Sequence, residues 1–182
     1  TFGVNSGPMM AAVDEFDITV KGKGGHAASP HLAIDPVVIS AQVISAVQTI
    51  ISRSTDPVDK ALISITKINA GTAYNVIDDQ VKMGGTIRTF RRETRAYIEK
   101  RLNELCKGIA DAHGAEIKIE FDLVNKYPPT INSKEETKFA ANVAKDLVGD
   151  DKVITDIDPS MGGEDFSYLL EKKPGSYLYL GQ

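Results

Sequence analysis

The chain has 182 residues, of which 42% are hydrophobic and 25% charged, a profile typical of a globular protein with one domain or one domain plus part of another. The net charge is -4 and the sequence has no run of basic residues, which argues against a nucleic-acid partner. No apolar run approaches the roughly 20 residues of a membrane span, which argues against a membrane partner. The single cysteine, Cys106, excludes an internal disulfide and fits a reducing compartment, so we expect a cytoplasmic protein.

Hydrophobic periodicity predicts six elements, in chain order a strand at 15–21, a helix at 35–52, strands at 61–69 and 80–90, a helix at 92–113 and a strand at 117–121. Asp35 suits the N-cap of the first helix, and Gly114 ends the second. Strand, helix, strand, strand, helix, strand is the order of the ferredoxin-like fold. We therefore predict an α+β domain at 14–123 with an antiparallel sheet and both helices on one face.

The remaining segments, 1–13 and 124–182, do not fit this unit. Ser133 and Glu136 form a predicted capping box for a helix that runs to about residue 147. A glycine-rich loop, a short helix and a strand follow it. These pieces are typical of a second, incomplete α/β domain. Because the chain begins without methionine and ends inside a predicted strand, we expect a fragment of a longer protein.

Two of the three histidines lie in the stretch GKGGHAASPH, at His26 and His31. Their spacing of five in a turn is poor for a metal pair on one helix face. Two interpretations remain equally open from the residues alone. Either Gly24 and Gly25 supply positive φ in a surface turn, or the glycines let a polar histidine approach a ligand closely.

Three further positions have both a structural and a functional interpretation. Asn75 falls in a predicted hairpin turn, where asparagine is common for backbone reasons. Arg88 alternates with an apolar neighbour on its strand, which favours a solvent-facing residue, although an arginine fork in a cleft would bind a carboxylate. Paired glycines at Gly162 and Gly163 would let the backbone approach a ligand.

The stretches SGPMMAA, GKGGHAASPHLAIDPVV, GGTAYNVIDDQVKMGGTIRTF, YPPTIN and DPSMGGEDFSYLLEKKPGSYLYLG together resemble the M20 metallopeptidase family. The resemblance is to its amidohydrolase branch, which includes N-acyl-amino-acid, hippurate and indole-acetyl-amino-acid hydrolases. It implies a catalytic α/β domain interrupted by a ferredoxin-like lid that also forms dimers. The lid would be 14–123, and 1–13 and 124–182 would belong to the catalytic domain.

The resemblance also implies roles for single residues. His26 matches the histidine that polarises the scissile carbonyl, and Asn75 and Arg88 match substrate-binding positions, with Arg88 gripping a carboxylate. Gly162 and Gly163 are predicted to bind substrate because paired glycines let the backbone approach it. The family usually has proline at the position of Asp78, so we expect a looser turn around Asn75.

The metal site is expected to lie elsewhere in the intact protein. The resemblance implies two divalent, zinc-type ions held by residues outside this chain, so no ligand is assigned here. We expect no metal on this chain and no activity from it alone.

Asn75 and Arg88 are thirteen residues apart, about 40 Å in an extended chain. At that separation the two residues could not both line one pocket in one subunit. We therefore expect a homodimer in which each site takes residues from both subunits, with 61–69 as a candidate pairing edge. The predicted reaction is hydrolysis of the amide of an N-acyl amino acid or small peptide-like substrate. The alternative is a non-catalytic ferredoxin-like module for dimerisation or small-molecule binding.

Overall fold

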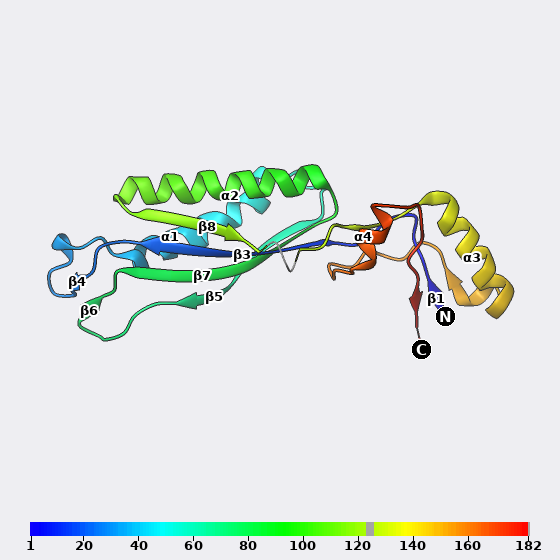
Figure 1. The fold of residues 1–182 in the computed structure, drawn as a ribbon, viewed down its shortest axis with the longest axis horizontal. Coiled ribbons are helices and arrows are strands. Elements are labelled where there is room, and N and C mark those ends of the chain that lie inside the picture. The colour runs from blue at the N-terminus through cyan, green and yellow to red at the C-terminus, as the bar shows by residue number, and fades with distance from the viewer. Residues whose placement is uncertain (123–125, 182) are drawn as a thin grey trace. The chain divides into compact units, whose positions relative to one another are not determined.

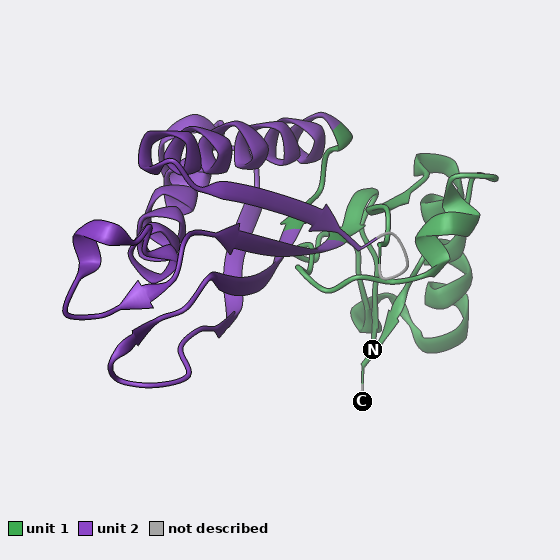
Figure 2. Cartoon of the chain, turned by 60° about the vertical axis from the view of Figure 1, so that its left-hand side comes forward, with its two compact units in different colours: residues 1–13, 88–92, 126–182 green, residues 14–87, 93–125 purple. Residues whose placement is uncertain are grey.

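The computed structural model describes residues 1–122 and 126–181 and divides the chain into two compact units (Figure 2). Unit 1 contains residues 1–13, 88–92 and 126–182, and unit 2 contains residues 14–87 and 93–125. Neither unit is one continuous stretch of sequence, because the chain leaves unit 1 and returns to it twice.

Unit 2 holds most of the ferredoxin-like part of the chain, while the ends of three of its elements, at residues 12–13, 88–89 and 92, are assigned to unit 1. Its elements are β3 (Ala12–Lys21), β4 (Gly25–His26), the 3-10 helix η1 (Pro30–Leu32), α1 (Pro36–Thr49), the π-helical turn η2 (Ile50–Ser54), β5 (Ala61–Asn69), β6 (Val76–Ile77), β7 (Gln80–Thr89), α2 (Arg92–His113) and β8 (Glu116–Phe121). The main sheet has the order β5-β7-β3-β8, and β3 pairs antiparallel with β8. This order confirms the predicted fold class.

Both helices of unit 2 cover the same face of that sheet (Figure 1). Alternate residues of β3 point into one core, which also receives the apolar stripes of α1 and α2. The residues that these elements bury together are Phe16, Ile18 and Val20 of β3, Ile39, Val43 and Val47 of α1, and Ile98, Leu102 and Cys106 of α2. The strands β5 and β8 form the two edges of the sheet.

The helix boundaries follow from local chemistry. Asp35 caps α1, because its carboxylate accepts a hydrogen bond from the Val37 N–H at 2.8 Å. Gly114 stops α2 with a φ of 68°, as expected for a helix-ending glycine. The predicted capping box is wrong: Ser133 precedes α3 (Lys134–Val148), but its hydroxyl accepts from the distant Gly175 N–H at 3.3 Å rather than from the helix.

One helical stretch in the described part of the chain, Pro36–Ser54, is long and apolar enough to cross a membrane by length and composition alone. This differs from the expectation that no apolar run of the chain approaches the length of a membrane span. Its inner face, however, packs on the sheet through Ile39, Val43 and Val47, as expected of a core helix. Only the inner face is covered in this way, since 28% of the stretch is buried and Val37 and Val38 on α1 are exposed.

Unit 1 is built from short pieces. They are β1 (Phe2–Gly3), β2 (Gly7–Met10), β9 (Thr130–Asn132), α3, the 3-10 helix η3 (Asp150–Lys152), β10 (Val153–Ile154), α4 (Phe166–Leu170) and β11 (Tyr179–Leu180). β1 lies between β10 and β11, and β2 pairs with β9. The core beneath α3 is small and gathers Val4, Ala141, Ala144 and Val153.

Cys106 provides a test of the core of unit 2. The residue is fully buried on α2, and burial raises the pKa of its thiol to about 12. Because the thiolate is the reactive species, we expect no reaction with a disulfide reagent such as DTNB at pH 8 while the chain is folded. One equivalent should react in denaturant. Rapid labelling of the folded chain would contradict the packing of α2.

Candidate functional site

His26 and Asn75 lie side by side at one corner of unit 2, although 49 residues separate them in the sequence. The short strands β4 and β6 pair antiparallel, with His26 opposite Val76. Directly beside this pair, the Ala27 N–H donates to the Asn75 carbonyl at 3.0 Å. Two of the five predicted site residues are therefore brought together.

The contacts of His26 define which of its nitrogens carries the proton. The side chain is exposed, and the Ala28 N–H donates to its Nδ1 at 3.1 Å. A nitrogen that accepts a hydrogen bond is unprotonated, so in the neutral ring the proton resides on Nε2. His26 therefore presents an N–H donor on its outer side, while its inner nitrogen holds the ring to the backbone.

The glycines near His26 do not follow the first of the two interpretations that the sequence left open. Neither Gly24 nor Gly25 has positive φ. Instead, a Cβ on Gly22 would lie 2.0 Å from the Ile34 carbonyl oxygen, and one on Gly24 would lie 2.7 Å from the Ile77 carbonyl oxygen. These glycines are needed for close packing of backbone on backbone, which holds the segment before His26 in place.

Two aspartates complete the support of this corner. The Gly24 N–H donates to Asp79 Oδ1 at 2.8 Å, and the Gly22 N–H donates to the Asp79 carbonyl at 2.8 Å. Asp78 accepts from the Thr72 hydroxyl at 2.8 Å, which closes the loop between β5 and β6. Proline has no side-chain acceptor and could not make this hydrogen bond. Asp78 therefore links the two ends of the loop at a position where the resemblance led us to expect a looser turn.

Asn75 occupies a tight turn. The Val76 N–H donates to the Ala73 carbonyl at 3.2 Å, so Tyr74 and Asn75 are the two central residues of a four-residue turn. Both side chains are exposed. Sequence reasoning singled out Asn75 and did not single out Tyr74, its neighbour in GTAYN.

Arg88 lies near the C-terminal end of β7. Its neighbours Ile87 and Thr89 are fully buried, whereas Arg88 is half-buried and points to the other side of the strand. Within residues 1–122 and 126–181 its guanidinium has no hydrogen bond and no ion pair. A half-buried cation without a partner is suited to binding an anion.

Gly162 and Gly163 lie in unit 1, where they contact the N-terminal segment through a hydrogen bond and through packing. The Ala11 N–H donates to the Gly162 carbonyl at 2.9 Å. A Cβ on Gly163 would lie 2.1 Å from the Val13 side chain, so this position requires glycine for packing. Packing against Val13 therefore explains why residue 163 is glycine. Contact of Gly163 with a ligand stays a prediction.

A polar cluster next to these glycines escaped the sequence analysis. The Tyr177 hydroxyl donates to Glu164 Oε2 at 3.2 Å, and burial, together with the Glu164 carboxylate, raises the pKa of Tyr177. The buried Asn132 holds the Tyr177 backbone in place, because its Oδ1 accepts from the Tyr177 N–H at 2.7 Å and its Nδ2 donates to the Tyr177 carbonyl at 2.9 Å. The motif YPPTIN contains this asparagine, but only the fold shows its partners.

In the described part of the chain, no group of three or more His, Cys, Asp or Glu side chains is placed to hold a metal ion. Neither His26 nor His31 belongs to such a group, and Cys106 is buried in the core of unit 2.

The chain matches known proteins along its full length. Residues 13–114 match the family model of the M20 peptidase dimerisation domain. The chain is 39% identical to N-acetylcysteine deacetylase from Bacillus subtilis, over 100% of this chain and 46% of that protein, and 39% identical to hippurate hydrolase from Campylobacter jejuni, over 98% and 46%.

A solved structure is also similar. It is a dinuclear metal binding peptidase of the M20 family from Bacillus subtilis, with a TM-score of 0.75 and 34% identity over 97% of this chain and 42% of that one. The chain thus spans about half the length of the relatives it matches. Residues 13–114 match the family's dimerisation domain, and both units match relatives in this family. The chain therefore belongs to the M20 peptidase family.

Proposed function

We propose that this chain is part of a metal-dependent amidohydrolase that cleaves the amide bond of N-acyl amino acids. The observation that carries the proposal is the corner of unit 2, where His26 presents an outward Nε2–H beside Asn75. Two relatives named for hydrolysing N-acetylcysteine and hippurate, both N-acylated amino acids, support this substrate class.

The residues of this chain have separable roles in that reaction. When water attacks an amide, the carbonyl oxygen gains negative charge, and a positioned N–H donor stabilises that charge. His26 supplies such a donor, and the adjacent Asn75 amide can bind the substrate next to it. Arg88, with no partner of its own in the described residues, would bind the substrate carboxylate through its planar fork.

The metal that activates the water is proposed to be bound by residues outside this chain. The similar dinuclear peptidase supports two ions, and no group of three or more candidate ligands is found among the described residues. We accordingly propose that the 182 residues alone do not catalyse the reaction.

We further propose a homodimer formed through unit 2. β5 lies at an edge of the main sheet, and an exposed edge strand is able to pair with a second copy. The turn with Asn75 precedes the N-terminal end of β7, and Arg88 lies near its C-terminal end. A site that uses both ends is simplest to build from two copies. Analytical ultracentrifugation tests the dimer, and a purely monomeric enzyme with full activity would contradict it.

Arg88→Ala in the full-length protein tests the substrate class. We expect KM for an N-acyl amino acid to rise about ten- to hundredfold, because a charge-assisted hydrogen bond to the carboxylate is lost. For the same substrate with its carboxylate converted to an amide, the variant should behave like the wild type. Steady-state kinetics on the two substrates measures the difference.

Lys82→Ala is the matched control, since Lys82 is an exposed cation on the same strand and the same face. It should leave both KM values unchanged. If Arg88→Ala changed the two substrates equally, Arg88 would not recognise the carboxylate.

A further inference from the structure

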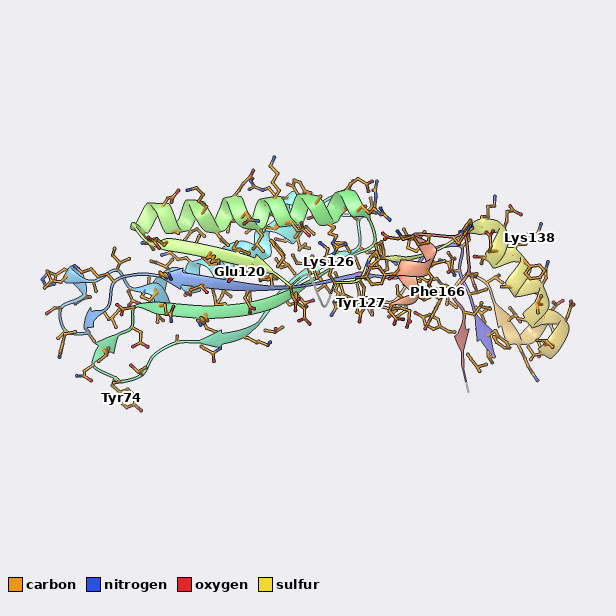
Figure 3. All side chains as sticks on the ribbon, in the orientation of Figure 1. Tyr74, Glu120, Lys126, Tyr127, Lys138 and Phe166 are labelled. Carbon is orange, nitrogen blue, oxygen red and sulfur yellow. The ribbon has the colours of Figure 1, made fainter. Side chains whose placement is uncertain are left out.

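Tyr74 is a fully exposed aromatic side chain beside Asn75. It is exposed at 109% of its reference area, and Figure 3 shows it at the outer end of the loop between β5 and β6. In the part of the chain that the structure describes, no hydrogen bond, ion pair or ring contact involves it. The side chain therefore contributes little to the stability of unit 2.

The turn that carries Tyr74 is nevertheless held firmly. The Asn75 carbonyl accepts from the Ala27 N–H at 3.0 Å, and the Thr72 hydroxyl donates to Asp78 at 2.8 Å across the base of the loop. An aromatic side chain on a pinned turn loses little conformational freedom when a ligand covers it. This arrangement is typical of an anchor for a ligand.

The position of Tyr74 indicates which part of a substrate would cover it. This step rests on the proposed function, in which His26 acts on the scissile carbonyl and Asn75 binds beside it. That carbonyl belongs to the acyl group, so the acyl group is the part of the substrate that lies next to the turn. The carboxylate, on the other side of the amide, would be held by Arg88.

We propose that Tyr74 is a specificity-determining residue that packs against the acyl group of the bound substrate and favours aromatic acyl groups. Its exposed ring offers a face for stacking, which a methyl group cannot use to the same extent. The adjacent Val76, opposite His26 and itself exposed, extends the apolar surface on the same strand pair.

The test compares N-benzoyl and N-acetyl forms of one amino acid as substrates of the full-length enzyme. Tyr74→Ala should lower kcat/KM for the N-benzoyl substrate about three- to tenfold more than for the N-acetyl substrate. Tyr74→Phe, which retains the ring, should keep the wild-type ratio. Val58→Ala is the control, because Val58 is exposed at 83% on a different loop of unit 2, and it should also keep the ratio.

Other outcomes overturn the inference. An equal loss on both substrates would mean that Tyr74 contacts protein rather than the acyl group, and no loss on either would mean that it contacts neither. A wild-type enzyme that hydrolyses neither substrate would refute the proposed function itself, and this inference with it. The wild-type measurement thus separates failure of the inference from failure of the function on which it rests.

Discussion

Replacement of His26 by alanine in the full-length enzyme is expected to lower kcat about 10²- to 10³-fold, the usual cost of losing one donor to a developing oxyanion. KM should change little, because the Nε2–H stabilises charge that appears in the transition state and not in the bound substrate. Steady-state kinetics with an N-acyl amino acid measures both constants.

His31→Ala is the matched control for this experiment. His31 is also exposed and lies five residues later in the same segment, but it belongs to η1 and not to the β4–β6 pair. Its loss should leave kcat and KM unchanged. Equal effects of the two substitutions, or a His26→Ala effect confined to KM, would remove His26 from the reaction.

His26→Gln refines the assignment. Glutamine retains an N–H donor but lacks the Nδ1 that accepts from the Ala28 N–H, so its donor is not held in the same direction. We expect it to recover part of the lost kcat and no more. Full recovery would mean that the position of the donor, fixed here by the backbone, is unimportant.

The elements that sequence reasoning predicted well are those whose pattern is local. The helix predicted at 92–113 is observed as α2 over the same residues, because its apolar residues repeat at helical spacing and Gly114 stops it. The strand β3 was predicted from its alternation, and β5 from its β-branched residues between turn segments. A strand buried on one face alternates polar and apolar residues, and that alternation is visible in the sequence.

What escaped prediction depends on contacts between distant residues. β4 and β6 have two residues each, too few for any periodicity, yet their pairing is what places His26 beside Asn75. The hydroxyl of Ser133 was expected to cap its own helix, but it accepts from Gly175 on another segment. Positive φ at Gly24 was one of two open interpretations, and the structure instead requires glycine there because Asp79 and Ile77 lie close.

A buried ion pair at the start of α2 also escaped the sequence analysis, although a signal for it was present. Asp14 shares the inward face of β3 with Phe16 and Ile18, so a carboxylate on that face requires a partner. The partner is Arg95 of α2. The side chains are only 2% and 13% exposed, and Arg95 Nη2 donates to Asp14 Oδ1.

Removal of either partner of this pair is expected to destabilise the protein strongly. Asp14→Ala leaves the largely buried Arg95 guanidinium with only its longer contact to Glu99, at 3.7 Å, and breaking a buried pair in this way costs about 3–5 kcal/mol in the free energy of unfolding. Urea unfolding followed by circular dichroism measures the loss. The double variant Asp14→Leu/Arg95→Leu should be more stable than Asp14→Ala, because no charge is left unpaired in the core.

The control for this pair is Arg92→Ala, three residues earlier, which removes an ion pair with Glu171 whose side chains are 67% and 34% exposed. Water screens such a pair, so its loss should cost less than about 1 kcal/mol. If Asp14→Ala cost no more than Arg92→Ala, the charge of Arg95 would be solvated in spite of its burial. If Asp14→Ala cost several times more than Arg92→Ala, the buried pair would hold the first turn of α2 against β3. It would then also stabilise the sheet that carries the candidate site.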